Sequence, residues 1–204
     1  MRGKILVTGT GRSGTSFTMQ VLTALGLDTG FDGPQHAFYR ERMAGQERTV
    51  DRNATEEDWD RLPRVVKDPR LIVTLGHFLG RGLPPPDHVY VLLRRIGDAA
   101  QLRVDRGMLW EPATLSDAPP WRHFPKPAQR AAQEEALYGG LGRLLEALAL
   151  HGVPHTLVQF PRLALDGEYF ADRLGGVLGH LPRADVLAVH RALADPSAIH
   201  YGRT

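Results

Sequence analysis

The hydrophobic and polar positions follow two different periods along this chain. Four short runs carry apolar residues at consecutive positions and end at glycine, proline or charged residues, which is typical of strands buried on both faces. They cover residues 4–8, 64–67, 88–93 and 156–160. Apolar residues at helical spacing predict helices over residues 13–25, 68–79, 98–106, 128–151, 167–178 and 183–193. Strands that alternate with helices predict an α/β fold with a central parallel sheet of about four to five strands, flanked by helices.

Two segments lack this periodicity. Residues 28–62 are rich in glycine, aspartate, arginine and proline, with one short helix expected near residues 36–44, and residues 110–127 form a proline-rich loop. Long irregular segments of compact domains are often functional, so we expect these two to shape the substrate side of any site. No internal repeat or linker divides the chain, which we therefore predict to be a single domain over residues 1–204.

Composition removes several classes of function. The 204 residues, 42% of them hydrophobic, are enough for one domain with a sizeable core. Cysteine is absent, which excludes disulfides, a cysteine nucleophile and thiolate metal ligands, and the nine histidines show no metal-ligand spacing. A net charge of +2 gives no case for a nucleic-acid or membrane partner. The first apolar run is too short for a signal-peptide core, so we expect a cytoplasmic protein.

The most informative segment lies between the first strand and the first helix. It reads Gly9-Thr10-Gly11-Arg12-Ser13-Gly14-Thr15-Ser16, which matches the P-loop pattern G-x-x-x-x-G-K-[ST] except that Thr15 occupies the lysine position. The glycines allow successive backbone N–H groups to converge on one anion, and the positive end of the helix adds to the attraction. We therefore predict a phosphate-binding loop in a P-loop NTPase-like three-layer sandwich, with these ligand residues: Gly11, Arg12, Ser13, Gly14, Thr15 and Ser16.

The missing lysine points to a different donor, because nucleoside triphosphatases need it at the outer phosphates. Arg12-Ser13-Gly14-Thr15-Ser16 matches the 5′-phosphosulfate loop of sulfotransferases, roughly [KR]-S-G-T-[ST]. Residues 65–71 and 89–94, VVKDPRL and VYVLLR, are similar to the "KDPRL … VVLLR" succession of bacterial members, and residues 158–163 match more loosely. Over about three quarters of its length the chain thus resembles the P-loop-type sulfotransferases that use 3′-phosphoadenosine 5′-phosphosulfate.

The resemblance implies transfer of a sulfuryl group from 3′-phosphoadenosine 5′-phosphosulfate to a hydroxyl or amine of a small molecule or glycan. Such a transfer has a loose in-line transition state, so catalysis consists mainly of positioning and charge stabilisation. The sulfuryl group carries less charge than a phosphoryl group, so no metal is required. Arg12 and Lys67 are the candidates for stabilising the oxygens of the transferring group.

The 3′-phosphate of the donor should meet Arg94, at the carboxyl end of the third strand, where ligands of open parallel sheets bind. Arg95 is a second candidate. The family usually places a serine eight positions after this arginine, and here that position is Leu102. Its neighbours Gln101 and Arg103 are the candidates to replace the serine.

The acceptor must also lose a proton to a general base. Asp68 leaves a strand end beside the loop, although it is equally suited to cap the helix that follows. Asp32 and His36 lie in the long irregular segment, and histidine has the more suitable intrinsic pKa. The sequence leaves these alternatives open.

Two other functions fit the same loop. A P-loop small-molecule or nucleotide kinase would use Asp68 as its metal-holding acid, although Thr15 in the lysine position argues against it. A non-catalytic anion-binding protein on the same fold is supported by Leu102 in place of the serine. Fold alone does not decide among the three.

Overall fold

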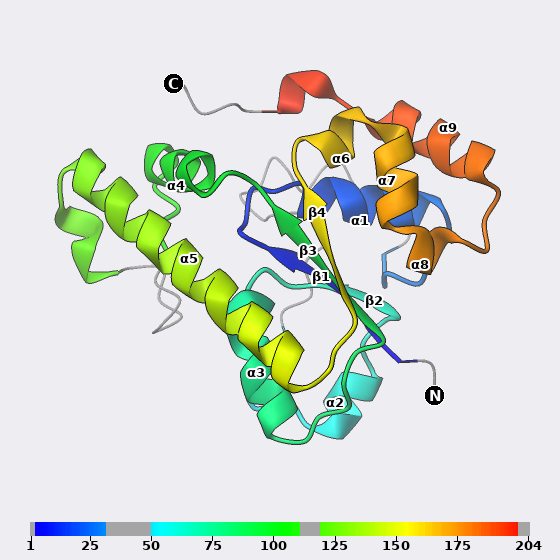
Figure 1. Ribbon diagram of the computed structural model, residues 1–204, viewed down its shortest axis with the longest axis horizontal. Coiled ribbons are helices and arrows are strands. Elements are labelled where there is room, and N and C mark those ends of the chain that lie inside the picture. The colour runs from blue at the N-terminus through cyan, green and yellow to red at the C-terminus, as the bar shows by residue number, and fades with distance from the viewer. Residues whose placement is uncertain (1–2, 32–49, 111–118, 200–204) are drawn as a thin grey trace.

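Four parallel strands form one sheet in the computed structural model, which describes residues 3–31, 50–110 and 119–199 (Figure 1). The strands are β1 (Ile5–Gly9), β2 (Val65–Lys67), β3 (His88–Leu93) and β4 (His155–Gln159), in the order β2-β1-β3-β4. The pairing of β1 with β3 runs from Ile5 opposite His88 to Gly9 opposite Leu92. All four predicted strands are confirmed, with bounds shifted by one residue at most.

The predicted helices are also present, except that one of them is divided into two. They are α1 (Thr15–Ala24), α3 (Leu71–Gly80), α4 (Ile96–Asp105), α5 (Lys126–Leu150) and α9 (Arg183–Leu193). The segment predicted as one helix over residues 167–178 is two, α7 (Gly167–Arg173) and α8 (Gly175–Leu178). The break falls at Leu174, directly before two glycines, which have low helix propensity.

In the described parts of the chain, the sequence pattern missed four short elements. They are α2 (Glu56–Asp60), α6 (Arg162–Leu165) and the 3₁₀ turns η2 (Pro120–His123) and η3 (Pro196–Ala198). Each is too short to show a helical period. The one available signal was the capping box of α2, in which Asp58 N donates to the Thr55 hydroxyl and the Asp58 carboxylate accepts from Thr55 N. The short helix expected near residues 36–44 lies outside the described residues.

Alternate residues of the strands face two separate hydrophobic clusters. Leu6, Val89 and Val91 pack with residues of α3 and α5, whereas Val7 and Leu92 pack with residues of α1 and of α6 to α9. Figure 1 shows the same arrangement, with α3 and α5 on one face of the sheet and α1 with α6–α9 on the other. The fold is thus α/β, a four-stranded parallel sheet flanked by helices.

The strand order creates a switch point beside β1. The chain passes from β1 to β2 on one side of it and then to β3 on its other side, so the direction of winding reverses between β1 and β3. Open parallel sheets bind ligands outside the carboxyl ends of their strands at such a point. The loop after β1 begins there.

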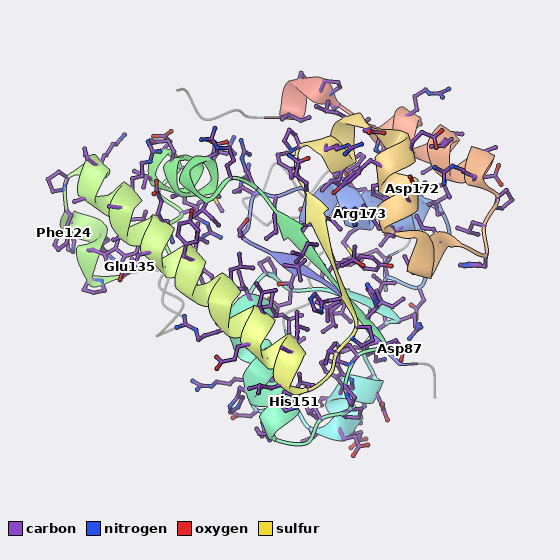
Figure 2. The ribbon with its side chains drawn as sticks, viewed as in Figure 1. Asp87, Phe124, Glu135, His151, Asp172 and Arg173 are labelled. Carbon is purple, nitrogen blue, oxygen red and sulfur yellow. The ribbon has the colours of Figure 1, made fainter. Side chains whose placement is uncertain are left out.

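The longest helix, α5, crosses one face of the sheet, and Figure 2 labels Phe124 just before its amino end and His151 just after its carboxyl end. Its sequence carries charged residues along its length, such as Arg130, Glu134 and Arg143. Across the described parts of the chain, no helix has both the length and the apolar character that crossing a membrane requires.

Gly142 of α5 gives a test of this helix. It is exposed, and a Cβ there would have no atom within 4 Å, so Gly142→Ala should stabilise the protein by about 1 kcal/mol through helix propensity and backbone entropy. The expected rise in melting temperature is about 2–4 °C, read by calorimetry or circular dichroism.

Gly107 is the matched control. It has the same open surroundings but a φ of 63°, in the left-handed region. Gly107→Ala should therefore destabilise the protein, by about 1–2 kcal/mol. A Gly142→Ala protein that melts below the wild type would contradict the helix described here.

Candidate anion-binding site

The loop of residues 9–16 is held against the end of β3 by its backbone. A Cβ at Gly9 would lie 2.0 Å from the carbonyl oxygen of Leu92, so only glycine fits where the two strands end. Thr10 N donates to the same carbonyl oxygen at 3.3 Å. Gly11 and Gly14 then adopt positive φ angles of 71° and 84°, which glycine accepts without strain. These turns carry the chain from the sheet into α1.

The amino end of α1 has no capping side chain. Gly14 is the N-cap, no side chain caps the helix, and no acidic residue lies in its first turn. The first amides of a helix have no acceptor within it and form its positive end. The hydroxyl of Ser13 is fully buried and has no hydrogen-bond partner among the described residues. Buried polar groups are normally satisfied, so this hydroxyl is one of the exceptions in the described parts of the chain.

Lys67 brings a buried cation to the loop from the neighbouring strand. Its side chain is fully buried at the end of β2, opposite Val7 of β1, and its Nζ donates to the Ser16 hydroxyl at 2.9 Å. Burial of an ammonium is costly unless anionic or polar groups compensate it. The Lys67 ammonium thus places a positive charge beside the amino end of α1.

Arg94 lies on the other side of β1, after β3, and is almost completely buried. Its Nη1 donates to the carbonyl oxygen of Arg12 at 3.3 Å, and its guanidinium carbon lies 5.2 Å from the centre of the Phe160 ring. The same ring supports Gly14, where a Cβ would lie 2.8 Å from Phe160 Cδ2. Phe160 therefore positions both the arginine and the turn of the loop. Sequence reasoning placed Phe160 in a strand and in the looser match over residues 158–163, and gave it no role at the loop.

Arg12 occupies the tip of the loop. It is half-buried and adopts a φ of 54°, the only positive φ of a non-glycine residue in the described parts of the chain. A left-handed non-glycine residue is uncommon and often belongs to a functional turn. The bond from Arg94 to its carbonyl oxygen holds Arg12 in this conformation.

The two neighbours of Leu102 differ in where they point. Arg103 reaches the loop, because a Cβ at Gly11 would lie 2.2 Å from Arg103 Nη2. Gln101 instead donates to the Asp105 carboxylate at 2.9 Å and accepts from Arg130 at 3.4 Å. Of the two predicted replacements for the serine, the structure places Arg103 at the loop, while the Gln101 amide bonds to side chains of α4 and α5.

Asp68 has both carboxylate oxygens engaged with backbone amides. Val50 N donates to Oδ2 at 2.9 Å and Arg70 N donates to Oδ1 at 2.8 Å. Burial raises the pKa of this carboxyl above its usual value, against the opposing effects of the two amides, Arg70 and Lys67. The N-cap of α3 is Arg70, so the expectation that Asp68 caps this helix was wrong, because its side chain bonds in the turn before it. The other predicted bases, Asp32 and His36, lie outside the described residues.

The raised pKa of Asp68 predicts a pH dependence. The folded protein holds this proton to higher pH than the unfolded chain does, so between about pH 4 and the raised pKa the contribution of Asp68 to stability falls as pH rises. The free energy of unfolding of the wild type, relative to Asp68→Asn, should therefore decrease with pH, as measured by denaturant titration at several pH values.

Asp185→Asn, at an exposed position of α9, serves as the surface control. The difference in free energy of unfolding between the wild type and Asp185→Asn should change less with pH than the difference between the wild type and Asp68→Asn. If the free energy of unfolding of the wild type, relative to Asp68→Asn, increases with pH, the pKa of Asp68 is not raised in the folded protein.

Together these residues form a candidate site for an anion. The loop supplies backbone amides, and three cations contact it: Lys67 of β2, Arg94 after β3 and Arg103 of α4. Cationic groups and helix-terminal amides bind phosphate or sulfate groups. Comparisons of the chain with protein-family models, with curated proteins and with solved structures found no match.

Proposed function

We propose that the chain is a sulfotransferase of the P-loop type, which takes a sulfuryl group from 3′-phosphoadenosine 5′-phosphosulfate and transfers it to a hydroxyl or amine of a small molecule or glycan. One observation carries this proposal. Lys67 Nζ donates to the hydroxyl of Ser16, the residue that holds Mg²⁺ in P-loop triphosphatases. In this chain the Ser16 hydroxyl is bonded to the Lys67 ammonium, a cation that can take the part of a metal ion at this position. This arrangement supports a transfer without metal.

The named residues supply what the transfer requires. A bond forms between the acceptor oxygen or nitrogen and sulfur, the bond from sulfur to the 5′-phosphate oxygen breaks, and negative charge develops on the leaving phosphate. Lys67, beside the amino end of α1, and Arg12, at the loop tip, stabilise that charge. Arg94 and Arg103 bind the second phosphate of the donor, at the 3′ position.

The acceptor proton goes to a general base. Asp68 already accepts two backbone amides, which favours a structural role in holding Val50 and the turn before α3. We therefore assign the proton to His36 or Asp32 of the long irregular segment. Histidine has an intrinsic pKa close to neutral pH, which suits it to this role.

The kinase alternative retains one supporting observation. Asp68 follows β2 beside the loop and is buried, as a metal-holding acid would be. Its oxygens, however, accept backbone amides, and the Ser16 hydroxyl accepts from Lys67. A metal ion would have to displace these bonds, so the arrangement favours the sulfotransferase.

Ligand binding separates these functions. Adenosine 3′,5′-bisphosphate without metal should raise the melting temperature by several degrees, since a ligand at 100 times its Kd stabilises by about 2.7 kcal/mol. ATP with magnesium should give little stabilisation. Stabilisation by ATP with magnesium alone would instead identify a kinase. Binding of the bisphosphate without any turnover of labelled donor over an acceptor panel would favour the non-catalytic protein.

The charge of Lys67 gives a second test with a matched control. Lys67→Met should weaken the binding of adenosine 3′,5′-bisphosphate by about tenfold or more, because a hydrogen bond to a charged group contributes about 1.5–3 kcal/mol. Lys4 is also buried, but it lies at the opposite end of β1 and donates to the carbonyl oxygens of Asp60 and Leu62.

Lys4→Met should therefore lower the free energy of unfolding and leave the Kd of the folded protein unchanged in isothermal titration. Equal weakening of binding by the two substitutions would show a general effect of losing a buried lysine, and Lys67 would lose its assigned role.

A further inference from the structure

A buried glutamine of α5 fixes the segment that follows α4. Gln133 is fully buried, its Oε1 accepts from Trp110 N at 3.0 Å, and its Nε2 donates to Trp110 O at 3.1 Å. The backbone N–H and C=O groups of Trp110 are thus both paired with the side-chain amide of Gln133. An apolar residue of similar size would leave these buried backbone groups without partners.

The ring of Trp110 supports Arg103. It is almost completely buried, and the guanidinium carbon of Arg103 lies 5.6 Å from the ring centre. Arg103 Nη1 also donates to the carbonyl oxygen of Met108 at 3.3 Å, while Met108 N donates back to the carbonyl oxygen of Arg103 at 2.8 Å. A planar guanidinium stacks well on an aromatic ring. The Arg103 side chain is therefore held by the turn on which Trp110 lies.

The guanidinium of Arg103 lies against Gly11 of the loop. The guanidinium occupies the space that Gly11 leaves open, since a Cβ there would lie 2.2 Å from Arg103 Nη2. Helices α4 and α5 pack side by side, as Figure 1 shows, so the contact between Gln133 and Trp110 joins α5 to the carboxyl end of α4. A continuous set of contacts runs from Gln133 through Trp110 and Arg103 to the anion-binding loop.

We infer that Gln133 is a positioning residue for the donor site: it holds Trp110, which holds the Arg103 guanidinium against the loop in the geometry that binds an anion. The inference deepens the proposed function and depends on it for the identity of the anion. The two hydrogen bonds of the Gln133 side chain go to the backbone of Trp110. Its effect on binding must therefore pass through Arg103.

The test uses the full chain and adenosine 3′,5′-bisphosphate in isothermal titration. Gln133→Leu should weaken binding by about tenfold, and Gln133→Glu, which keeps the acceptor for Trp110 N, should weaken it less. In the Arg103→Ala protein, Gln133→Leu should cause no further loss, because the two residues act on the ligand through the same contact. Fully additive losses would overturn the inference.

Gln129 provides the matched control, one turn earlier on the same helix. Its Nε2 donates to the carbonyl oxygens of Arg122 and Phe124, at 2.6 and 2.8 Å, away from the loop. Gln129→Leu should lower the free energy of unfolding without changing the Kd. If Gln129→Leu and Gln133→Leu weaken binding equally, Gln133 has only a structural role.

A ligand-free measurement keeps this inference separate from the proposed function. The NMR order parameter of the Arg103 Nε–H, assigned by its loss in Arg103→Lys, should fall in Gln133→Leu and stay unchanged in Gln129→Leu. If the wild type does not bind the bisphosphate, the proposed function fails. A fall of this order parameter in Gln133→Leu would still support the positioning role of Gln133. An Arg103 guanidinium equally rigid in the wild type and Gln133→Leu overturns it.

Discussion

The buried ammonium group of Lys67 is the constraint on which the site depends. Parallel pairing of β2 with β1 sets Lys67 opposite Val7, so the side chain leaves the sheet beside the amino end of α1. Full burial there removes the ammonium from water, and the Ser16 hydroxyl is one of its polar partners. The positive end of α1 adds charge of the same sign. An anion at the loop would therefore stabilise the cation and the helix end together.

Close packing constrains the loop at its glycines. Leu92 O, the Phe160 ring and the Arg103 guanidinium each occupy space that a Cβ at Gly9, Gly14 or Gly11 would fill. These three contacts come from β3, from the end of β4 and from α4. The loop conformation is thus set by elements distributed over most of the chain.

Local signals explain how much of this could be predicted from the sequence. The strand, the glycines and the helix of residues 5–24 are consecutive, and their pattern is sufficient to predict a strand, a glycine-rich loop and a helix in this order. Phe160 and Gln133 carry no comparable signal, because their roles depend on contacts with Gly14 and Trp110 that only the tertiary fold creates. Asp68 was correctly placed beside β2, but the amide of Val50, which bonds to its carboxylate, follows an irregular segment whose course has no sequence pattern.

Under the proposed function, Arg103 takes the place of the serine that the resemblance leads us to expect at Leu102. Residues 99, 100 and 102 of α4 are buried, so Leu102 belongs to the face that packs into the protein. The next residue lies about 100° further around the helix, and Arg103 points to the loop at Gly11. A serine would donate one hydroxyl at short range, whereas the guanidinium carries charge and two parallel donors over a longer reach. That longer reach is useful only if the side chain is held in place, which is the role of the Trp110 ring and of the glutamine behind it.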